Sequence, residues 1–356
     1  MHKNERCYEE NDMKSPKVVY LITRAHGLKT HLLKTDQFFR MLTWRDMSAI
    51  YDFLLKTDYS EELAMISPEH FDPAEMERIF YNKLSQRLYF LLEISDGRIR
   101  TAFESYSRKI ELENLRRITR AIYAGEKITE TQLIPIPRKY QSVNFPALLQ
   151  AQTLREMVDL LGETVYRDLK NALIIYEKYG NPLVIEAQES RVCYELIWRS
   201  LRGIADQAAV KELIGTEIDL KNLQYIFSFK YMNMEEELFE KLIIDIRYKL
   251  PKNLAEQLAG VSYQNVPEHL TWPRYREIGM KAVELISKGK LGDTENLFLQ
   301  QLYSYAETIA IRNPNNLVYV FTYLELCFRE ARNLTSLIVG KHLRMEDEKI
   351  RSLLLL

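Results

Sequence analysis

The chain has 356 residues, of which 46% are apolar and 28% are charged, which is enough for a large core. Its 49 basic and 50 acidic residues nearly cancel, so the composition excludes a general electrostatic attraction to nucleic acid or to anionic lipid. The three cysteines, Cys7, Cys193 and Cys327, are too few and too scattered for a disulfide framework or a zinc site, and they favour a reducing compartment.

The start of the chain is polar and charged and has no apolar segment of the kind found in secretory signals. We therefore predict an N-terminal extension over residues 1–17. No uncharged apolar run in the chain reaches the roughly 18 residues that span a bilayer. We accordingly predict no direct membrane insertion.

Three helix starts follow along the chain, each marked by a capping residue and a proline. They lie at Ser15, at Asp72 with Pro73, and at Asn313 with Pro314. The segments that follow carry apolar residues at three- and four-residue steps, and Asn-Gly or Asp-Gly hairpins between strand-like runs are absent from the sequence. The sequence therefore predicts an all-α fold.

Two proline-containing regions interrupt the helical pattern, one over residues 133–149 and the other over residues 251–273. Proline cannot continue a helix, so these regions are expected to be connectors. They divide the remaining chain into three predicted helical repeats, over residues 18–132, 133–250 and 251–356.

A pattern with asparagine in the middle of a helix occurs once in each predicted repeat, as acidic-x-x-Asn-Leu-x-x-Ile/Leu. Its residues are Glu111, Asn114, Leu115 and Ile118, then Asp219, Asn222, Leu223 and Ile226, then Glu330, Asn333, Leu334 and Leu337. The asparagines are 222 − 114 = 108 and 333 − 222 = 111 residues apart. Because asparagine is a poor helix former, we interpret its amide as holding a neighbouring backbone segment in place.

A second, weaker element precedes each copy of this pattern. It consists of a leucine with further residues five and eight positions later: Leu42, Met47 and Ile50, then Leu161, Tyr166 and Leu169, then Leu258, Tyr263 and Val266. Two elements in the same order three times predict a triplicated helical unit. A period near 110 residues is too long for a tetratricopeptide or HEAT repeat, which run roughly 34–47 residues.

Three stretches of this sequence resemble the C subunit of V-type and A-type rotary ATPases, called subunit d in eukaryotes. They are YLITRAHGLKTHLL near the start, EIDLKNLQYIF in the middle, and EARNLTSLIVGKHLRMEDEKIRSLL at the end. The last stretch is similar to the closing pattern of that family, with an acid, Asn-Leu, Gly-Lys and a short final helix. The resemblance runs from about Tyr20 to the end of the chain.

The resemblance implies three similar helical lobes arranged as a funnel about a pseudo-threefold axis. It implies a rotor subunit of the central stalk that receives the shaft subunits of the D and F type and sits on the membrane proteolipid ring. Such a subunit transmits torque for proton or sodium transport, lies peripherally at the cytoplasmic face of the membrane, and is not an enzyme.

No catalytic, cofactor-binding or metal site is predicted. Two Gly-Lys pairs, at Gly289 and Gly340, lack the other residues of a phosphate-binding loop. His26 and His31 are five apart, which places them on different faces of a helix. Two alternatives remain open at this point: a helical scaffold that joins soluble partners without an ATPase, and an all-α enzyme with a site assembled from scattered residues.

Overall fold

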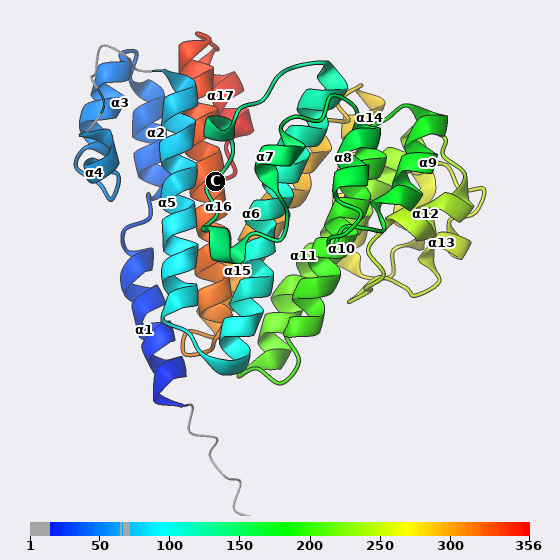
Figure 1. Cartoon of the computed structure of the whole chain (residues 1–356), viewed down its shortest axis with the longest axis horizontal. Helices are drawn as coiled ribbons and strands as arrows, with labels where there is room; N and C mark the ends of the chain where they lie inside the picture. Colours follow the sequence, from blue (N-terminus) through cyan, green and yellow to red (C-terminus); the bar gives the residue numbers. More distant parts are fainter. Residues whose placement is uncertain (1–14, 65, 67–71) are drawn as a thin grey trace, which may run out of the picture.

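The computed structural model describes residues 15–64, 66 and 72–356, and within them every regular element is a helix (Figure 1). This confirms the all-α prediction. Six long helices form the body: α5 (Pro73–Glu93), α6 (Gly97–Ala124), α10 (Leu183–Ser200), α11 (Gln207–Tyr231), α15 (Asp293–Arg312) and α16 (Val318–His342).

Shorter helices surround this body. They are α1 (Pro16–Lys29), α2 (Thr35–Thr43), α3 (Met47–Leu54), α4 (Ser60–Leu63), α7 (Phe145–Leu148), α8 (Leu154–Leu160), α9 (Leu169–Tyr179), α12 (Glu236–Leu242), α13 (Leu254–Gln257), α14 (Pro273–Ser287) and α17 (Asp347–Leu353). Single 3-10 turns η2 (Glu130–Gln132) and η3 (Arg138–Tyr140) lie in the first proline-containing region, and η4 (Tyr263–His269) lies in the second.

Two of the three predicted helix starts are confirmed. The Ser15 hydroxyl accepts a hydrogen bond from the Val18 amide at 3.4 Å, and the Asp72 carboxylate accepts one from the Ala74 amide at 3.1 Å. The predicted start at Asn313 is wrong, because α16 begins only at Val318. The side-chain amide of Asn313 donates instead to the carbonyl oxygen of Ile309 at 3.0 Å, so this residue ends the preceding helix, α15.

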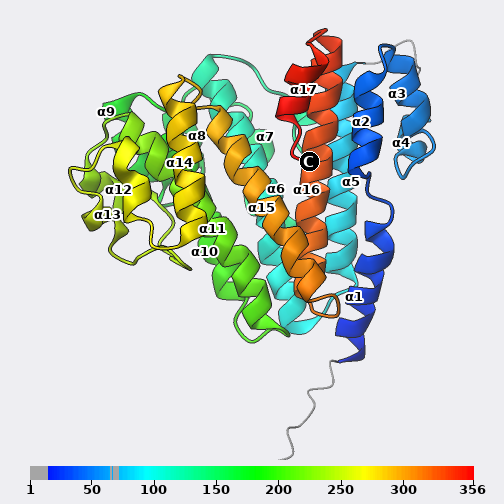
Figure 2. The ribbon, with the colours of Figure 1, turned by 180° about the vertical axis from the view of Figure 1, so that it is seen from behind.

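The six long helices form three hairpin pairs, α5 with α6, α10 with α11 and α15 with α16. Each pair packs along the next, since α6 contacts α10, α11 contacts α15, and α16 contacts α5, which closes the circuit of contacts. The three hairpin turns lie together at the lower end of Figures 1 and 2, where the ribbons of the long helices are closest; the ribbons spread toward the upper end.

Apolar side chains from all six long helices and from the surrounding helices form one continuous buried cluster. Cys193 and Cys327 are both part of it, and burial raises the pKa of each thiol to about 12. These two cysteines are therefore buried and unreactive, as free cysteines in cores usually are. Cys7 lies outside the described residues.

Gly340, in the Gly-Lys pair near the C-terminus, lies where α17 packs on α16. A Cβ atom at this position would lie 2.7 Å from Cγ1 of Ile350, whereas a Cβ atom at Gly27 in α1 would meet nothing within 4 Å. We expect Gly340→Ala to destabilise the protein by about 1–3 kcal/mol through overpacking. Gly27→Ala is the matched control, and it is expected to stabilise by about 0.5–1 kcal/mol because alanine favours the helix. Urea unfolding measures both changes, and equal effects of the two substitutions would contradict this account of the glycine.

Candidate interaction site inside the helical ring

The three asparagines of the repeated pattern all bind backbone, and they do so in the same way. Each side-chain amide forms hydrogen bonds with both the N–H and the C=O of one residue in the segment that follows its helix: Asn114 with Ile134, Asn222 with Ile244, and Asn333 with Leu355. The distances from the backbone nitrogen to the asparagine oxygen are 2.7, 2.8 and 2.8 Å. The partners lie 20, 22 and 22 residues after the asparagine.

All three asparagines are buried, with at most 1% of the side chain exposed. The amide therefore satisfies a backbone segment that no helix or strand partner reaches, and this explains why a poor helix former stands in the middle of each helix. The apolar members of the pattern are buried as well: Leu115, Leu223, Leu334, Ile118, Ile226 and Leu337.

Replacing Asn333 with leucine is expected to lower the free energy of unfolding by about 1–3 kcal/mol, because the N–H and C=O of Leu355 lose their partner in a buried place. Asn171, exposed on α9, is the matched control, and Asn171→Leu is expected to change the free energy by less than about 0.5 kcal/mol. Chemical denaturation gives both values. Unchanged stability of Asn333→Leu would remove the role assigned to this amide.

The acidic residues of the pattern connect each helix pair to the segment of the chain that precedes the next pair. Each accepts one hydrogen bond from a tyrosine hydroxyl and at least one from a backbone N–H: Glu111 from Tyr166 and Ser142, Asp219 from Tyr275 and from Tyr248, Lys249 and Leu250, and Glu330 from Tyr59 and Leu33. The tyrosine oxygens lie 3.0, 3.1 and 2.7 Å from the carboxylates. The acid on α16 thus reaches a tyrosine near the start of the chain, so these contacts follow the same closed circuit as the helices.

These tyrosines share a sequence pattern that the sequence analysis missed, Leu-x-x-Thr/Pro-x-Tyr. Its copies are Leu54, Thr57 and Tyr59, then Leu161, Thr164 and Tyr166, then Leu270, Pro273 and Tyr275. The tyrosines precede the asparagines by 55, 56 and 58 residues (114 − 59, 222 − 166 and 333 − 275). Of the second element chosen from the sequence, only Tyr166 has this role; Met47 and Tyr263 do not contact an acid of the pattern in the part of the chain that the structure describes.

A pocket lies between the helix pairs and is lined by residues from all six long helices. Four basic side chains line it, Lys109, Arg116, Lys221 and Arg332, together with four carboxylates, Glu113, Glu217, Glu295 and Glu325. Each of α5, α10 and α15 adds one tyrosine, Tyr81, Tyr194 and Tyr303. The charges balance, so the lining has no strong overall sign, and leucine and phenylalanine side chains complete it. We call this feature the central pocket.

Lys109 joins three of the long helices at the wall of the central pocket. Its ammonium nitrogen lies 2.6 Å from Oε1 of Glu217 on α11 and 2.5 Å from Oε1 of Glu325 on α16. The hydroxyl of Tyr194 donates to Glu217 at 2.7 Å, and that of Tyr106 donates to Glu325 at 2.5 Å. All three charged groups are at least nine-tenths buried, so their mutual pairing compensates for lost hydration.

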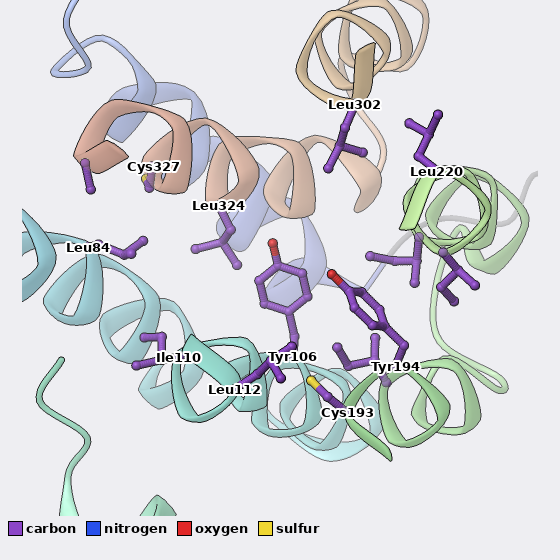
Figure 3. Packing of buried hydrophobic residues seen from close by; sticks show 14 of the residues in the cluster. Leu84, Tyr106, Ile110, Leu112, Cys193, Tyr194, Leu220, Leu302, Leu324 and Cys327 are labelled. Atoms are coloured by element: carbon purple, nitrogen blue, oxygen red, sulfur yellow. The ribbon is translucent and has the colours of Figure 1, made fainter. Parts of the chain in front are cut away.

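Figure 3 shows the hydroxyl groups of Tyr106 and Tyr194 directed toward the same space, which Leu220, Leu302 and Leu324 border. The polar groups of the central pocket are thus framed by apolar side chains. Such a frame strengthens the electrostatic interactions within it, because it keeps the local dielectric low.

Burial and neighbouring charges shift several pKa values in the central pocket. Burial and the nearby Glu217 carboxylate raise the pKa of Glu325 to about 7. Burial alone would raise the pKa of Glu295, but Lys221 and Arg332 lower it to about 2. Burial, with Arg116 nearby, lowers the pKa of Lys221 to about 8. Glu295 is therefore ionised at neutral pH, whereas the pKa values of Glu325 and Lys221 both lie near neutral pH.

Two buried polar atoms in the central pocket, Oε2 of Glu217 and Nε of Arg116, have no hydrogen-bond partner among the described residues. One is an acceptor and the other a donor, so the pocket has unused capacity for both. Its charged residues were not predicted as a site, although most lie within a few positions of the repeated asparagine on the same helices.

His26 and His31 are not brought together. His26 lies 2.8 Å from the carbonyl oxygen of Pro314 and stacks on Tyr319, while His31 lies 3.4 Å from Asp58. Within the described ranges no group of three or more His, Cys, Asp or Glu side chains is arranged to hold a metal ion. Among the same residues, no helix has the length and apolar character needed to cross a bilayer.

The profile of the family described as ATP synthase (C/AC39) subunit matches residues 21–353 of this chain. The chain belongs to this family. Among similar proteins is the C subunit of the A-type ATP synthase of Methanocaldococcus jannaschii, which is 22% identical over 341 residues, covering 94% of this chain and 86% of its own length. The proteins of the same name from Methanococcoides burtonii and Haloquadratum walsbyi are also 22% identical, over 349 and 351 residues. They are covered over 95% and 96% of their lengths, and this chain over 96% and 93%.

The family assignment confirms the resemblance drawn from the sequence. It makes the chain a member of a family of ATP synthase subunits. The matched residues include all three helices that carry the repeated asparagines.

Proposed function

We propose that this chain is a non-catalytic rotor subunit of the central stalk in a V-type or A-type ATPase. In this role it is a socket that joins the rotor shaft, formed by subunits of the D and F type, to the membrane proteolipid ring. It lies peripherally at the cytoplasmic face of the membrane and transmits torque for proton or sodium transport.

The observation that carries this proposal is the closed circuit of three helix pairs around the central pocket. A torque-transmitting socket must hold an axle and resist shear between its parts. The central pocket, lined by all six long helices, marks the axis on which an axle would seat. Shear is resisted by the buried contacts of Glu111, Asp219 and Glu330 with tyrosines that precede the next helix pair.

We further propose that the helix pairs belong to three copies of one unit, near the predicted boundaries 18–132, 133–250 and 251–356. The asparagine contacts support a slightly later first boundary, since Ile134 is bound by Asn114 of the first unit. Residues 1–14 of the predicted extension lie outside the described residues, and Pro16 and Lys17 already belong to α1.

The test is a mild detergent extraction from the native host with an affinity tag on this chain. We expect the shaft subunits and the proteolipid to copurify with it. Copurification with soluble proteins alone would overturn the proposal in favour of a helical scaffold. ATP hydrolysis by the pure isolated chain would contradict its non-catalytic part.

A pair of variants tests the place of the shaft. Gln224 lines the central pocket on α11, and Gln224→Trp would fill part of it. Gln257 is exposed on α13 and does not line the pocket, so Gln257→Trp is the matched control. We expect the first variant to lose the shaft subunits from the purified assembly while keeping its own fold, and the second to retain them. Equal retention would show that the shaft does not enter the pocket.

A further inference from the structure

The three hairpin turns and the start of α1 form one continuous surface, which we call the turn end (lower end of Figures 1 and 2). It comprises residues 94–98, 201–206 and 311–317 and the first turn of α1. The turns bind one another: Nη1 of Arg98 donates to the carbonyl oxygen of Gly203 at 3.4 Å, and the amide of Leu317 donates to Asp206 at 2.7 Å. The arrangement of these three segments is therefore fixed by the fold.

The turn end carries one exposed arginine at each turn, Arg98, Arg202 and Arg312. None of the three forms an ion pair with any other residue that the structure describes. The acidic residues of the same surface are already engaged, since Asp96 pairs with Lys17 and Asp206 accepts from Leu317. The guanidinium groups of Arg202 and Arg312 and the remaining N–H groups of Arg98 are thus available to an anionic partner, although the whole chain has a net charge of only −1.

Exposed apolar side chains lie at the turn end or on the adjoining turns of α1 and α5. The side chain of Ile311, at the end of α15, is 79% exposed. Near the start of α1, Val19 and Tyr20 are 50% and 51% exposed, and Phe90 close to the end of α5 is 36% exposed. Arginines interspersed with aromatic and aliphatic side chains, on a surface without a spanning segment, are typical of proteins that rest on a membrane interface.

We propose that the turn end binds the headgroups of anionic phospholipids. The arginines contact lipid phosphates, and Ile311, Val19 and Tyr20 reach the boundary between headgroups and acyl chains. Arginine suits this role because its planar guanidinium donates two hydrogen bonds to one phosphate. This binding is a property of the isolated chain, and it does not rest on the proposed rotor function.

The experiment is cosedimentation of the purified full chain with phosphatidylcholine vesicles that contain or lack 30% phosphatidylglycerol, a fraction we set at roughly physiological anionic content. We expect binding to the anionic vesicles only, and its loss as salt is raised from about 0.05 to 0.5 M, because salt screens exposed charges. The variant R98Q/R202Q/R312Q is expected to bind at least about tenfold more weakly.

The matched control removes three exposed basic residues from the opposite end, K127Q/K290Q/R344Q, which likewise form no ion pair among the described residues. It changes the net charge equally and is expected to bind as the unmodified chain does. Equal weakening by both triple variants would mean a general charge effect and would overturn the proposal. So would equal binding to vesicles with and without phosphatidylglycerol, or binding only to an acidic protein and never to vesicles.

Discussion

Replacing Lys109 with methionine is expected to lower the free energy of unfolding by about 3–5 kcal/mol at pH 8.5, because Glu217 and Glu325 then face each other without a counter-ion in a buried place. Lys109 binds carboxylates on α11 and α16 at once, so its loss weakens the contacts between all three helix pairs. Urea unfolding at fixed pH measures the change.

The cost of this substitution depends on pH in a defined direction. The pKa of Glu325 in the folded chain, about 7, lies above the usual value of about 4.3 in an unfolded chain. Its contribution to stability is therefore complete below that unfolded value and is lost as the pH rises through 7. Without Lys109 the pKa rises further, so we expect Lys109→Met to cost less at pH 5.5 than at pH 8.5.

Two further variants make this result interpretable. The exposed ion pair of Lys281 with Glu277 serves as the control, and Lys281→Met is expected to cost less than about 1 kcal/mol. The double variant Lys109→Met/Glu325→Gln is expected to regain much of the lost stability at pH 8.5. A cost for Lys109→Met that matches the surface control at every pH would contradict the role assigned to this lysine.

Arg87→Met is expected to be similarly destabilising, by about 3–5 kcal/mol. The Arg87 guanidinium lies 2.7 Å from Glu330 and 2.8 Å from Asp58, and only 5% of its side chain is exposed. Burial alone would lower its pKa, but Tyr59 and Glu330 hold it above its usual value, so the guanidinium stays charged. This contact joins α5 to α16. These two helices belong to the first and the last helix pair, so no hairpin turn connects them.

A double-variant cycle separates the lost ion pair from lost packing. In Arg87→Met/Glu330→Gln the buried carboxylate is replaced by a neutral amide, whose oxygen can still accept from the Leu33 N–H and whose NH2 can donate to the Tyr59 hydroxyl, so at least about half of the lost stability is expected to return. The exposed pair of Arg155 with Glu177 is the surface comparison, and Arg155→Met is expected to cost less than about 1 kcal/mol. No recovery in the double variant would mean that packing of the arginine stem, rather than its charge, stabilises the contact between α5 and α16.

The repeated asparagines were predictable because their chemistry conflicts with their surroundings. An amide in the middle of an apolar helix, three times at nearly constant spacing, indicates a backbone contact, and each amide forms one. The contacted residues were not predictable. Ile134, Ile244 and Leu355 lie in irregular segments, where neither periodicity nor turn chemistry identifies the position that reaches the helix.

The tyrosines that donate to the acids of the pattern were not predicted, for a different reason. Apolar spacing aligns Met47 and Tyr263 with Tyr166, whereas the corresponding contacts to the acids are made by Tyr59 and Tyr275. Their distance along the chain from the asparagine identifies the tyrosines instead, because it changes by only a few residues.

The central pocket could not be predicted from one sequence. Lys109, Glu217 and Glu325 each look like an ordinary charge on a helix face, and such charges are usually solvated. Only the packing of three helix pairs against one another brings them together and buries them. The helical class of the fold, by contrast, follows from local patterns of apolar residues and helix caps, which one chain contains in full.

The most direct test of the socket proposal is electron cryo-microscopy of the detergent-extracted assembly. The account predicts a single copy of this chain on the rotation axis. The shaft reaches the central pocket from one end of the chain, and the proteolipid ring contacts the other end. A copy at the periphery of the assembly, or on the axis with an empty pocket, would contradict it.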